Sequence, residues 1–176
     1  MEAIDIPGWM SEHELDWLHR NAKDHHYIIE IGSYLGRSTR ALASGTPGFV
    51  VAIDDWYGPR DMALERPDRN VFTSFMSNVE GLDVRPIRIN YNDLFRMKLW
   101  FTPDMIFIDG DHRYASVLRD IRWSMSVMRQ GFLCGHDIDR PDVKEAVMKS
   151  LPAAKVVCGS IWAVNLSIHY GARPRG

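Results

Sequence analysis

Short apolar runs alternate with amphipathic segments along this sequence, and this alternation is the feature that most restricts its fold. Residues 11–24 place Leu15, Leu18 and Ala22 at the spacing of one helical face, and residues 114–130 repeat that pattern. Because most of the intervening runs are apolar throughout, they predict an α/β fold: a Rossmann-like, doubly wound and mainly parallel seven-stranded sheet with helices on both faces. The predicted strands are 27–32, 48–56, 84–90, 104–109, 131–137, 154–159 and 161–170.

Length and charge limit the classes of protein to which this chain can belong. A chain of 176 residues suits one domain, residues 1–176, and its net charge of -2 includes basic residues that are spread along the whole sequence. Basic residues that are spread in this way do not form the basic patch that attracts a nucleic acid or an anionic membrane, so we expect neither partner. Residues 1–15 lack a basic stretch followed by an apolar one, and no window is apolar enough to cross a bilayer. These features predict a cytoplasmic protein.

Polar side chains follow four of the predicted strands at the point where each strand ends. In open α/β sheets, ligands bind beyond the carboxyl ends of the strands, where the strand order reverses. We therefore expect one binding site built from four clusters, at residues 32–36, 54–56, 109–113 and 136–137.

The first cluster is a glycine loop within EIGSYLGRST, residues 30–39. Its G-x-x-x-G spacing differs from the dinucleotide fingerprint, and no P-loop lysine follows it. Asp54 ends the next strand, where a carboxylate can accept hydrogen bonds from both hydroxyls of a ribose. Both features also have explanations without a ligand. The acids Asp54 and Asp55 could lie in a solvated loop or cap a helix, and Gly32 taken by itself could serve a tight turn. Together, the loop and Asp54 favour a nucleoside ligand that lacks a pyrophosphate.

Four ordered segments, EIGSYLGRST, AIDDW, IFIDGDHRY and GFLCGHD, resemble the class I S-adenosylmethionine-dependent methyltransferases. The likeness covers about residues 25–168 and is strongest to the metal-dependent catechol and macrolide-sugar O-methyltransferases. The resemblance implies S-adenosylmethionine as cofactor, with Asp54 at the ribose and Asn92 near the adenine. The residues that it places at the cofactor are Glu30, Gly32, Ser33, Gly36, Asp54, Asp55, Asn92 and Asp109.

Asp109, His136 and Asp137 end two of the predicted strands, and two carboxylates with an imidazole are suitable ligands for a divalent ion. The resemblance implies that these positions bind a metal, although the middle one is usually an acid in the similar enzymes. Magnesium prefers oxygen ligands, so His136 also admits manganese, iron or zinc. The alternative is that the three side chains hydrogen-bond to neighbouring loops without a metal.

His112 is the predicted catalytic base, because a neutral imidazole can accept the proton of a hydroxyl that attacks a methyl group. Asp109, three residues earlier, is the second predicted catalytic residue, since a metal that it binds could hold the same hydroxyl. The alternative for His112 is a hydrogen bond to a backbone carbonyl near the start of a helix. Asp111 is expected to cap the helix that begins near Tyr114, and Trp56 to wall the pocket.

The predicted function is transfer of a methyl group from S-adenosylmethionine to a hydroxyl of a small-molecule acceptor, with a divalent metal such as magnesium or manganese assisting. Two alternatives stay open: a metal-independent methyltransferase acting on nitrogen or a macromolecule, and an inactive nucleoside-binding subunit. Any lid over the substrate must come from the N-terminus, the loop around residues 56–68, or a second subunit. The last option leaves a homo-oligomer open.

Overall fold

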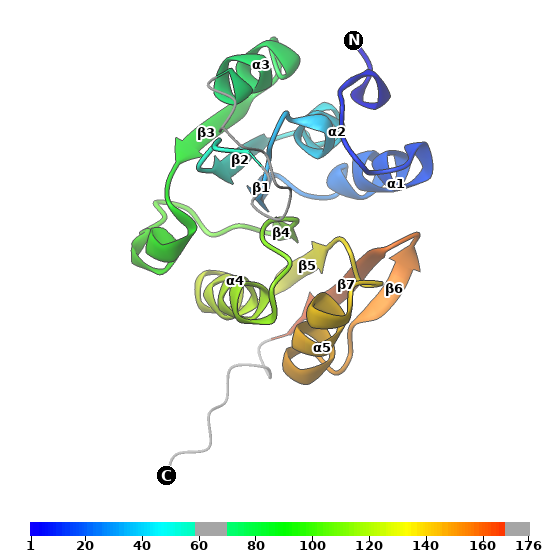
Figure 1. The fold of residues 1–176 in the computed structure, drawn as a ribbon, viewed down its shortest axis with the longest axis vertical. Coiled ribbons are helices and arrows are strands. Elements are labelled where there is room, and N and C mark those ends of the chain that lie inside the picture. The colour runs from blue at the N-terminus through cyan, green and yellow to red at the C-terminus, as the bar shows by residue number, and fades with distance from the viewer. Residues whose placement is uncertain (59–69, 168–176) are drawn as a thin grey trace.

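The computed structural model describes residues 1–58 and 70–167. At its centre lies one sheet with the strand order β3-β2-β1-β4-β5-β7-β6 (Figure 1). β7 runs antiparallel to β5 and β6, while the other pairings are parallel, so the predicted Rossmann-like seven-stranded sheet is confirmed. The strands are β1 Tyr27–Ile31, β2 Phe49–Asp54, β3 Val84–Arg88, β4 Met105–Ile108, β5 Gly131–Gly135, β6 Lys155–Cys158 and β7 Ile161–Leu166.

Helices cover both faces of this sheet, because successive residues of a strand point in opposite directions. Ile28 of β1 packs with Leu18 and Leu42 on one face, whereas Ile29 packs with Ile121 and Val147 on the other. Figure 1 shows α1, α2 and α3 on the first side and α4 and α5 on the second. The helices are α1 Glu12–Ala22, α2 Arg37–Gly45, α3 Val71–Asn78, α4 Tyr114–Val127 and α5 Pro141–Ser150, with short 3-10 helices η1 Ala3–Asp5 and η2 Tyr91–Arg96.

The structure confirms two local predictions, the N-cap at Ser11 and the edge position of the strand that contains Pro86. Ser11 is the N-cap of α1, and its hydroxyl accepts a hydrogen bond from the Glu14 amide while the Glu14 carboxylate accepts one from the Ser11 amide. β3, which contains Pro86, lies at an edge of the sheet and, within the described part of the chain, pairs with β2 only. An edge position suits proline because its missing N–H removes no inner ladder bond.

The strand order places the site. The chain leaves β1 through α2 to reach β2 on one side, and it later returns to pair β4 with the other side of β1. The helices that follow β1 and β4 therefore lie on opposite faces of the sheet, so the chain diverges beyond the ends of these strands and opens a crevice there.

Candidate active site

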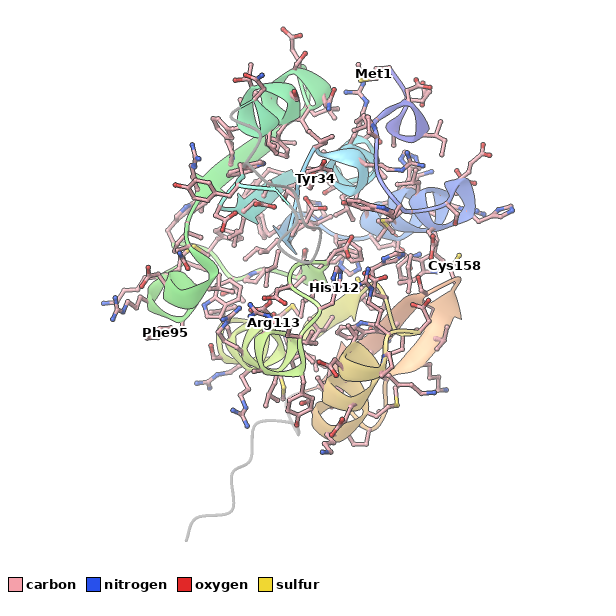
Figure 2. The ribbon with its side chains drawn as sticks, viewed as in Figure 1. Met1, Tyr34, Phe95, His112, Arg113 and Cys158 are labelled. Atoms are coloured by element: carbon pink, nitrogen blue, oxygen red, sulfur yellow. The ribbon has the colours of Figure 1, made fainter. Side chains whose placement is uncertain are left out.

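A cavity of about 660 Å³ lies at this crevice. Its walls come from the glycine loop after β1, the ends of β2, β4 and β5, the N-terminal residues 7–10, and the turn between β6 and β7. The volume lies in the range typical of sites for small molecules and cofactors. In Figure 2, Tyr34 from the glycine loop and His112 from the loop before α4 both lie over the middle of the sheet.

The glycine loop is held against the backbone that follows β4. Gly32 has a φ of +92°, and a Cβ built there would lie 2.2 Å from the carbonyl oxygen of Asp109. Such a contact is impossible, so only glycine lets these two loops approach each other. Gly32 is therefore more than a turn residue, because it also lets the loops after β1 and β4 pack against each other.

Asp54 shapes the same loop. One carboxylate oxygen accepts hydrogen bonds from the amides of Ser33 and Tyr34, both at 2.9 Å, and the other accepts from the Trp56 amide at 2.7 Å. Burial raises the pKa of Asp54, while these backbone bonds oppose the shift. Asp54 also lines the cavity, as does Asp55, which accepts a hydrogen bond from the amide two residues on.

Glu30 is fully buried in β1 and binds the start of α2. Its carboxylate accepts hydrogen bonds from the hydroxyls of Ser38, at 2.6 Å, and Thr39. Burial raises the pKa of Glu30 to about 7, although the hydroxyl donors oppose the change. The side chain therefore joins a strand to a helix beneath the cavity, and Gly36 forms the N-cap of that helix.

The glycine-loop side of the cavity fits a nucleoside-like cofactor. Ser33 belongs to the cavity wall, and its buried hydroxyl has no partner at hydrogen-bond distance among the described residues, although it lies close enough to the Glu30 carboxylate to lower the pKa of that group. A buried hydroxyl without a partner is costly, so a ligand that bonds to it is favoured. Asn92 lies in η2, but its side chain is outside the part of the chain that the structure describes.

The ends of β4 and β5 bring Asp109, His136 and Asp137 together. His136 Nδ1 lies 3.7 Å from Asp109 Oδ1 and 3.5 Å from Asp137 Oδ2, and one donor atom of each residue falls within 4.8 Å of the others. Burial lowers the pKa of His136, but the two aspartates and Glu14 outweigh it and raise the value to about 9. Burial raises the pKa of Asp109 to about 6. The donors fit a divalent ion that would replace the proton on Nδ1.

His112 faces the same cavity from the loop before α4. Its Nε2 lies 2.7 Å from Asp137 Oδ2. Desolvation would raise the pKa of Asp137, but hydrogen bonds from His112 and His136 outweigh it and keep the pKa far below its ordinary value. An ionised carboxylate only accepts hydrogen bonds, so Nε2 carries a proton and the lone pair of the neutral ring lies on Nδ1. A carboxylate thus holds one side of this ring.

Asp111 and Arg113 lie outside this arrangement. Asp111 accepts hydrogen bonds from the Arg113 amide at 3.0 Å, from the exposed Arg113 guanidinium, and from the Ser116 hydroxyl at 3.1 Å. The expected cap of α4 is wrong, because Arg113 is the N-cap residue and the Tyr114 amide donates to Asp142 at 3.1 Å rather than to Asp111.

The N-terminal segment contributes cavity residues that sequence patterns missed. Trp9 is 64% exposed, and its ring stacks on Tyr34 with centroids 5.6 Å apart. The guanidinium of Arg37 donates to the carbonyls of Ile4, Ile6 and Met10, which holds this segment over the cavity. Tyr34 lies within the glycine loop, but Trp9 lies in no recognisable motif, so no local sequence signal indicated that it would form this wall.

Trp56 was the residue expected to wall the pocket, and that expectation was wrong. Its side chain is 2% exposed and packs against Phe72 and Phe75 of α3. The indole N–H donates to the Tyr34 carbonyl at 3.0 Å, so Trp56 supports the glycine loop from below.

Residues 29–138 match the family model described as a methyltransferase domain. The chain belongs to this methyltransferase family. The matched segment runs from β1 through His136 and Asp137 and so includes the glycine loop and the acid–histidine cluster. The predicted class I methyltransferase identity is thereby confirmed. A search of curated proteins gave no match to the sequence.

Solved structures share the fold of this methyltransferase. Cofactor-bound Rv0187 from MTB aligns with a TM-score of 0.70 at 18% identity, over 94% of this chain and 85% of that one. The O-methyltransferase from Bacillus cereus in complex with SAH gives 0.69 at 20% identity, over 94% and 86%. TomG, an O-methyltransferase from Streptomyces achromogenes in complex with SAM, gives 0.66 at 18% identity, over 93% and 85%. Within the described residues of the present chain, none of the helices has the length and apolar character needed to span a bilayer.

Proposed function

We propose that this methyltransferase transfers a methyl group from S-adenosylmethionine to a hydroxyl of a small molecule. The observation that carries the proposal is a single cavity with the glycine loop on one side and the His112–Asp137 pair on the other. A methyl donor and a proton acceptor must lie close together for this reaction, and the cavity places suitable residues for both within one space.

On the donor side, Ser33, Asp54 and Asp55 would contact the cofactor directly, since they line the cavity. S-adenosylmethionine carries a methyl group on a positively charged sulfur. An oxygen nucleophile attacks this methyl group readily, because the neutral thioether is a good leaving group. Glu30 would act indirectly by fixing α2, and Gly32 and Gly36 by shaping the loop. Asn92 and Asp109 complete the set of residues that we assign to the cofactor.

On the acceptor side, His112 would take the proton of the hydroxyl through Nδ1. The acceptor oxygen bonds to the methyl carbon as the carbon–sulfur bond breaks, and its electron pair stays on sulfur. Asp137 holds Nε2–H and stabilises the imidazolium that forms. Expulsion of water when both substrates bind would favour this step, because the positive charge on sulfur is lost as the methyl group moves to oxygen.

A divalent ion at Asp109, His136 and Asp137 would supply a Lewis acid that makes the acceptor hydroxyl easier to deprotonate. The chain offers a route without it as well, since the His112–Asp137 pair can carry the proton alone. Activity in the presence of a chelator distinguishes the two routes.

The aromatic wall of Trp9 and Tyr34 favours an acceptor that carries a flat ring. Both residues of the stacked pair line the cavity, and aromatic stacking contributes about 0.5 to 1.5 kcal/mol beyond burial. We infer that an aromatic hydroxyl is a better acceptor than a sugar hydroxyl.

Calorimetric titration with S-adenosylhomocysteine, followed by radiolabelled methyl transfer to a panel of catechols, phenols and sugars, tests the proposal. We expect saturable binding and transfer to the aromatic hydroxyls in preference to the sugars. Absence of both heat and thermal shift at millimolar S-adenosylhomocysteine would contradict the proposed cofactor. Binding without transfer to any acceptor would favour the inactive nucleoside-binding alternative.

A further inference from the structure

We propose that Glu14, a residue of the N-terminal helix α1, is a positioning residue that holds the His136 imidazole with Nδ1 facing Asp109 and Asp137. The affinity of the methyltransferase for a divalent ion then depends on a side chain outside the ligand set. This inference rests on the metal part of the proposed function and is separate from methyl transfer itself.

Both oxygens of the Glu14 carboxylate are held by hydrogen bonds, and the residue is buried. Oε2 accepts from the Ser11 amide at 2.8 Å and from the Ser11 hydroxyl at 2.7 Å. Oε1 accepts from the Ser160 amide at 2.9 Å and lies 3.1 Å from His136 Nε2. The Ser160 hydroxyl closes the group, at 3.1 Å from Oε1 and 3.0 Å from His136 Nε2. A carboxylate fixed in this way is a rigid support for the imidazole.

The turn between β6 and β7 is built to leave room for this carboxylate. A Cβ at Gly159, where φ is +51°, would lie 2.4 Å from Glu14 Oε1. The glycine therefore lets the turn approach α1 closely enough for Ser160 to reach Glu14. The contact joins three segments that are far apart along the chain: α1, the end of β5, and the β6–β7 turn.

The chemistry of imidazole explains what this contact does. A carboxylate at Nε2 accepts the Nε2 proton, so the lone pair of a neutral ring falls on Nδ1. Nδ1 of His136 is the atom that faces Asp109 and Asp137, at 3.7 and 3.5 Å. Histidines that bind metals commonly donate their other N–H to a carboxylate, which orients the ring and raises its basicity. Glu14 occupies that place for His136.

Titration calorimetry with Mn²⁺ and Zn²⁺ on the full chain tests the inference. Glu14→Ala should bind these ions about 10- to 100-fold more weakly than the wild type, as is usual when such an outer partner is removed. Glu14→Gln retains a hydrogen-bond acceptor but lacks the charge, so its affinity should fall between the two. An additional, activity-independent readout is the long-range ¹H–¹⁵N spectrum of the histidines, in which Glu14→Ala should shift the Nε2 resonance of His136, because the Ser160 hydroxyl then replaces the carboxylate as its partner.

Ser11→Ala is the matched control, because it removes a bond to the other oxygen of Glu14 and weakens the same helix end. We expect it to lower stability by about 1 kcal/mol and to leave metal affinity unchanged, since the contact to His136 remains.

The outcomes separate the two proposals. Equal metal affinity in wild type, Glu14→Ala and Glu14→Gln would overturn the role of Glu14 and would leave the methyl-transfer proposal untouched. If Glu14→Ala fails to fold, unchanged affinity in Glu14→Gln has the same meaning. A wild-type protein that binds neither ion but still transfers methyl groups overturns this inference and leaves the methyl-transfer proposal standing.

Discussion

The two sides of the cavity use their carboxylates in different ways. On the glycine-loop side, Glu30 bonds to hydroxyls of α2 and Asp54 bonds to three backbone amides, so both acids serve the fold. On the side formed by β4 and β5, Asp109 and Asp137 lie beside histidines and border the cavity.

The two sets of acids are therefore expected to affect different properties, the stability of the fold in the first set and the chemistry of the site in the second. Acids that bond to the chain's own donors hold the glycine loop in place, and their replacement should weaken folding and cofactor binding together. Acids that lie beside histidines tune proton transfer or metal binding, and their replacement should change turnover more than stability. Four substitutions test whether this contrast holds.

Gly32→Ala should have the largest effect, and it acts on the glycine-loop side. The added Cβ would overlap the Asp109 carbonyl, so the loops after β1 and β4 must separate. We expect a loss of more than about 3 kcal/mol of unfolding free energy, measured by thermal and denaturant unfolding. Gly81→Ala is the control, because Gly81 has a φ of +80° but nothing within 4 Å of its Cβ position. Equal losses in both variants would refute the close contact at Gly32.

His112→Ala should have the next largest effect and acts on the other side. Removal of a general base slows turnover by about 100- to 10,000-fold, while S-adenosylhomocysteine affinity and unfolding free energy should change little. The control is His26→Ala, because His26 precedes β1 at the opposite end of the strand. An active His112→Ala enzyme, with methyl transfer shown to limit the rate, would remove the catalytic role.

Glu30→Gln tests the glycine-loop side through pH. The folded-state pKa of Glu30, about 7, lies above the ordinary value of 4.5, so the folded protein binds more protons than the unfolded chain between these values. Wild-type stability should therefore fall as pH rises from 4.5 to 7, by up to about 3 kcal/mol from this residue. The glutamine variant should lack this component, which urea unfolding at several pH values would measure. Parallel stability curves for the two proteins would contradict the raised pKa.

Asp54→Asn should have the smallest effect of the four. The amide group presents a donor where one backbone N–H now finds an oxygen, which costs about 2 kcal/mol for a lost bond to a charged group. We expect stability and S-adenosylhomocysteine affinity to fall together, as measured by unfolding and calorimetry. Asp83→Asn is the control, since that exposed acid pairs with Arg85 at the surface. If Asp54→Asn bound S-adenosylhomocysteine weakly but had wild-type stability, Asp54 would contribute to ligand binding and not to the stability of the fold.

Much of the fold could be predicted from the sequence because the relevant signals are local. The strands around Ile29 and Val51 read as continuous apolar runs, and the spacing of Leu15, Leu18 and Ala22 described a helix that the structure contains. The parallel arrangement then followed from alternation, and a parallel sheet brings the ends of its strands to one edge. Position along a strand was therefore enough to gather the candidate site residues.

The partners of those residues could not be read in the same way. Glu14 has the spacing of a capping box, and only the packing of α1 beside β5 places its carboxylate against His136, 122 positions away. Gly32 looked like a turn glycine until the Asp109 backbone was seen to lie against it. Trp56, expected at the pocket, is buried under α3, while Trp9 lines the cavity, because burial depends on which helix covers a loop.

The sequence by itself determined the elements of this protein, their order, and the edge of the sheet at which polar side chains gather. Those properties depend on the spacing of neighbouring residues, which helical and extended backbones convert directly into faces and ends. Only the tertiary structure decided which charge meets which: Asp137 with His112, and Glu14 with His136. The direction of a side chain at the end of a strand is set by the packing of segments that are distant in sequence, so no local pattern contains it.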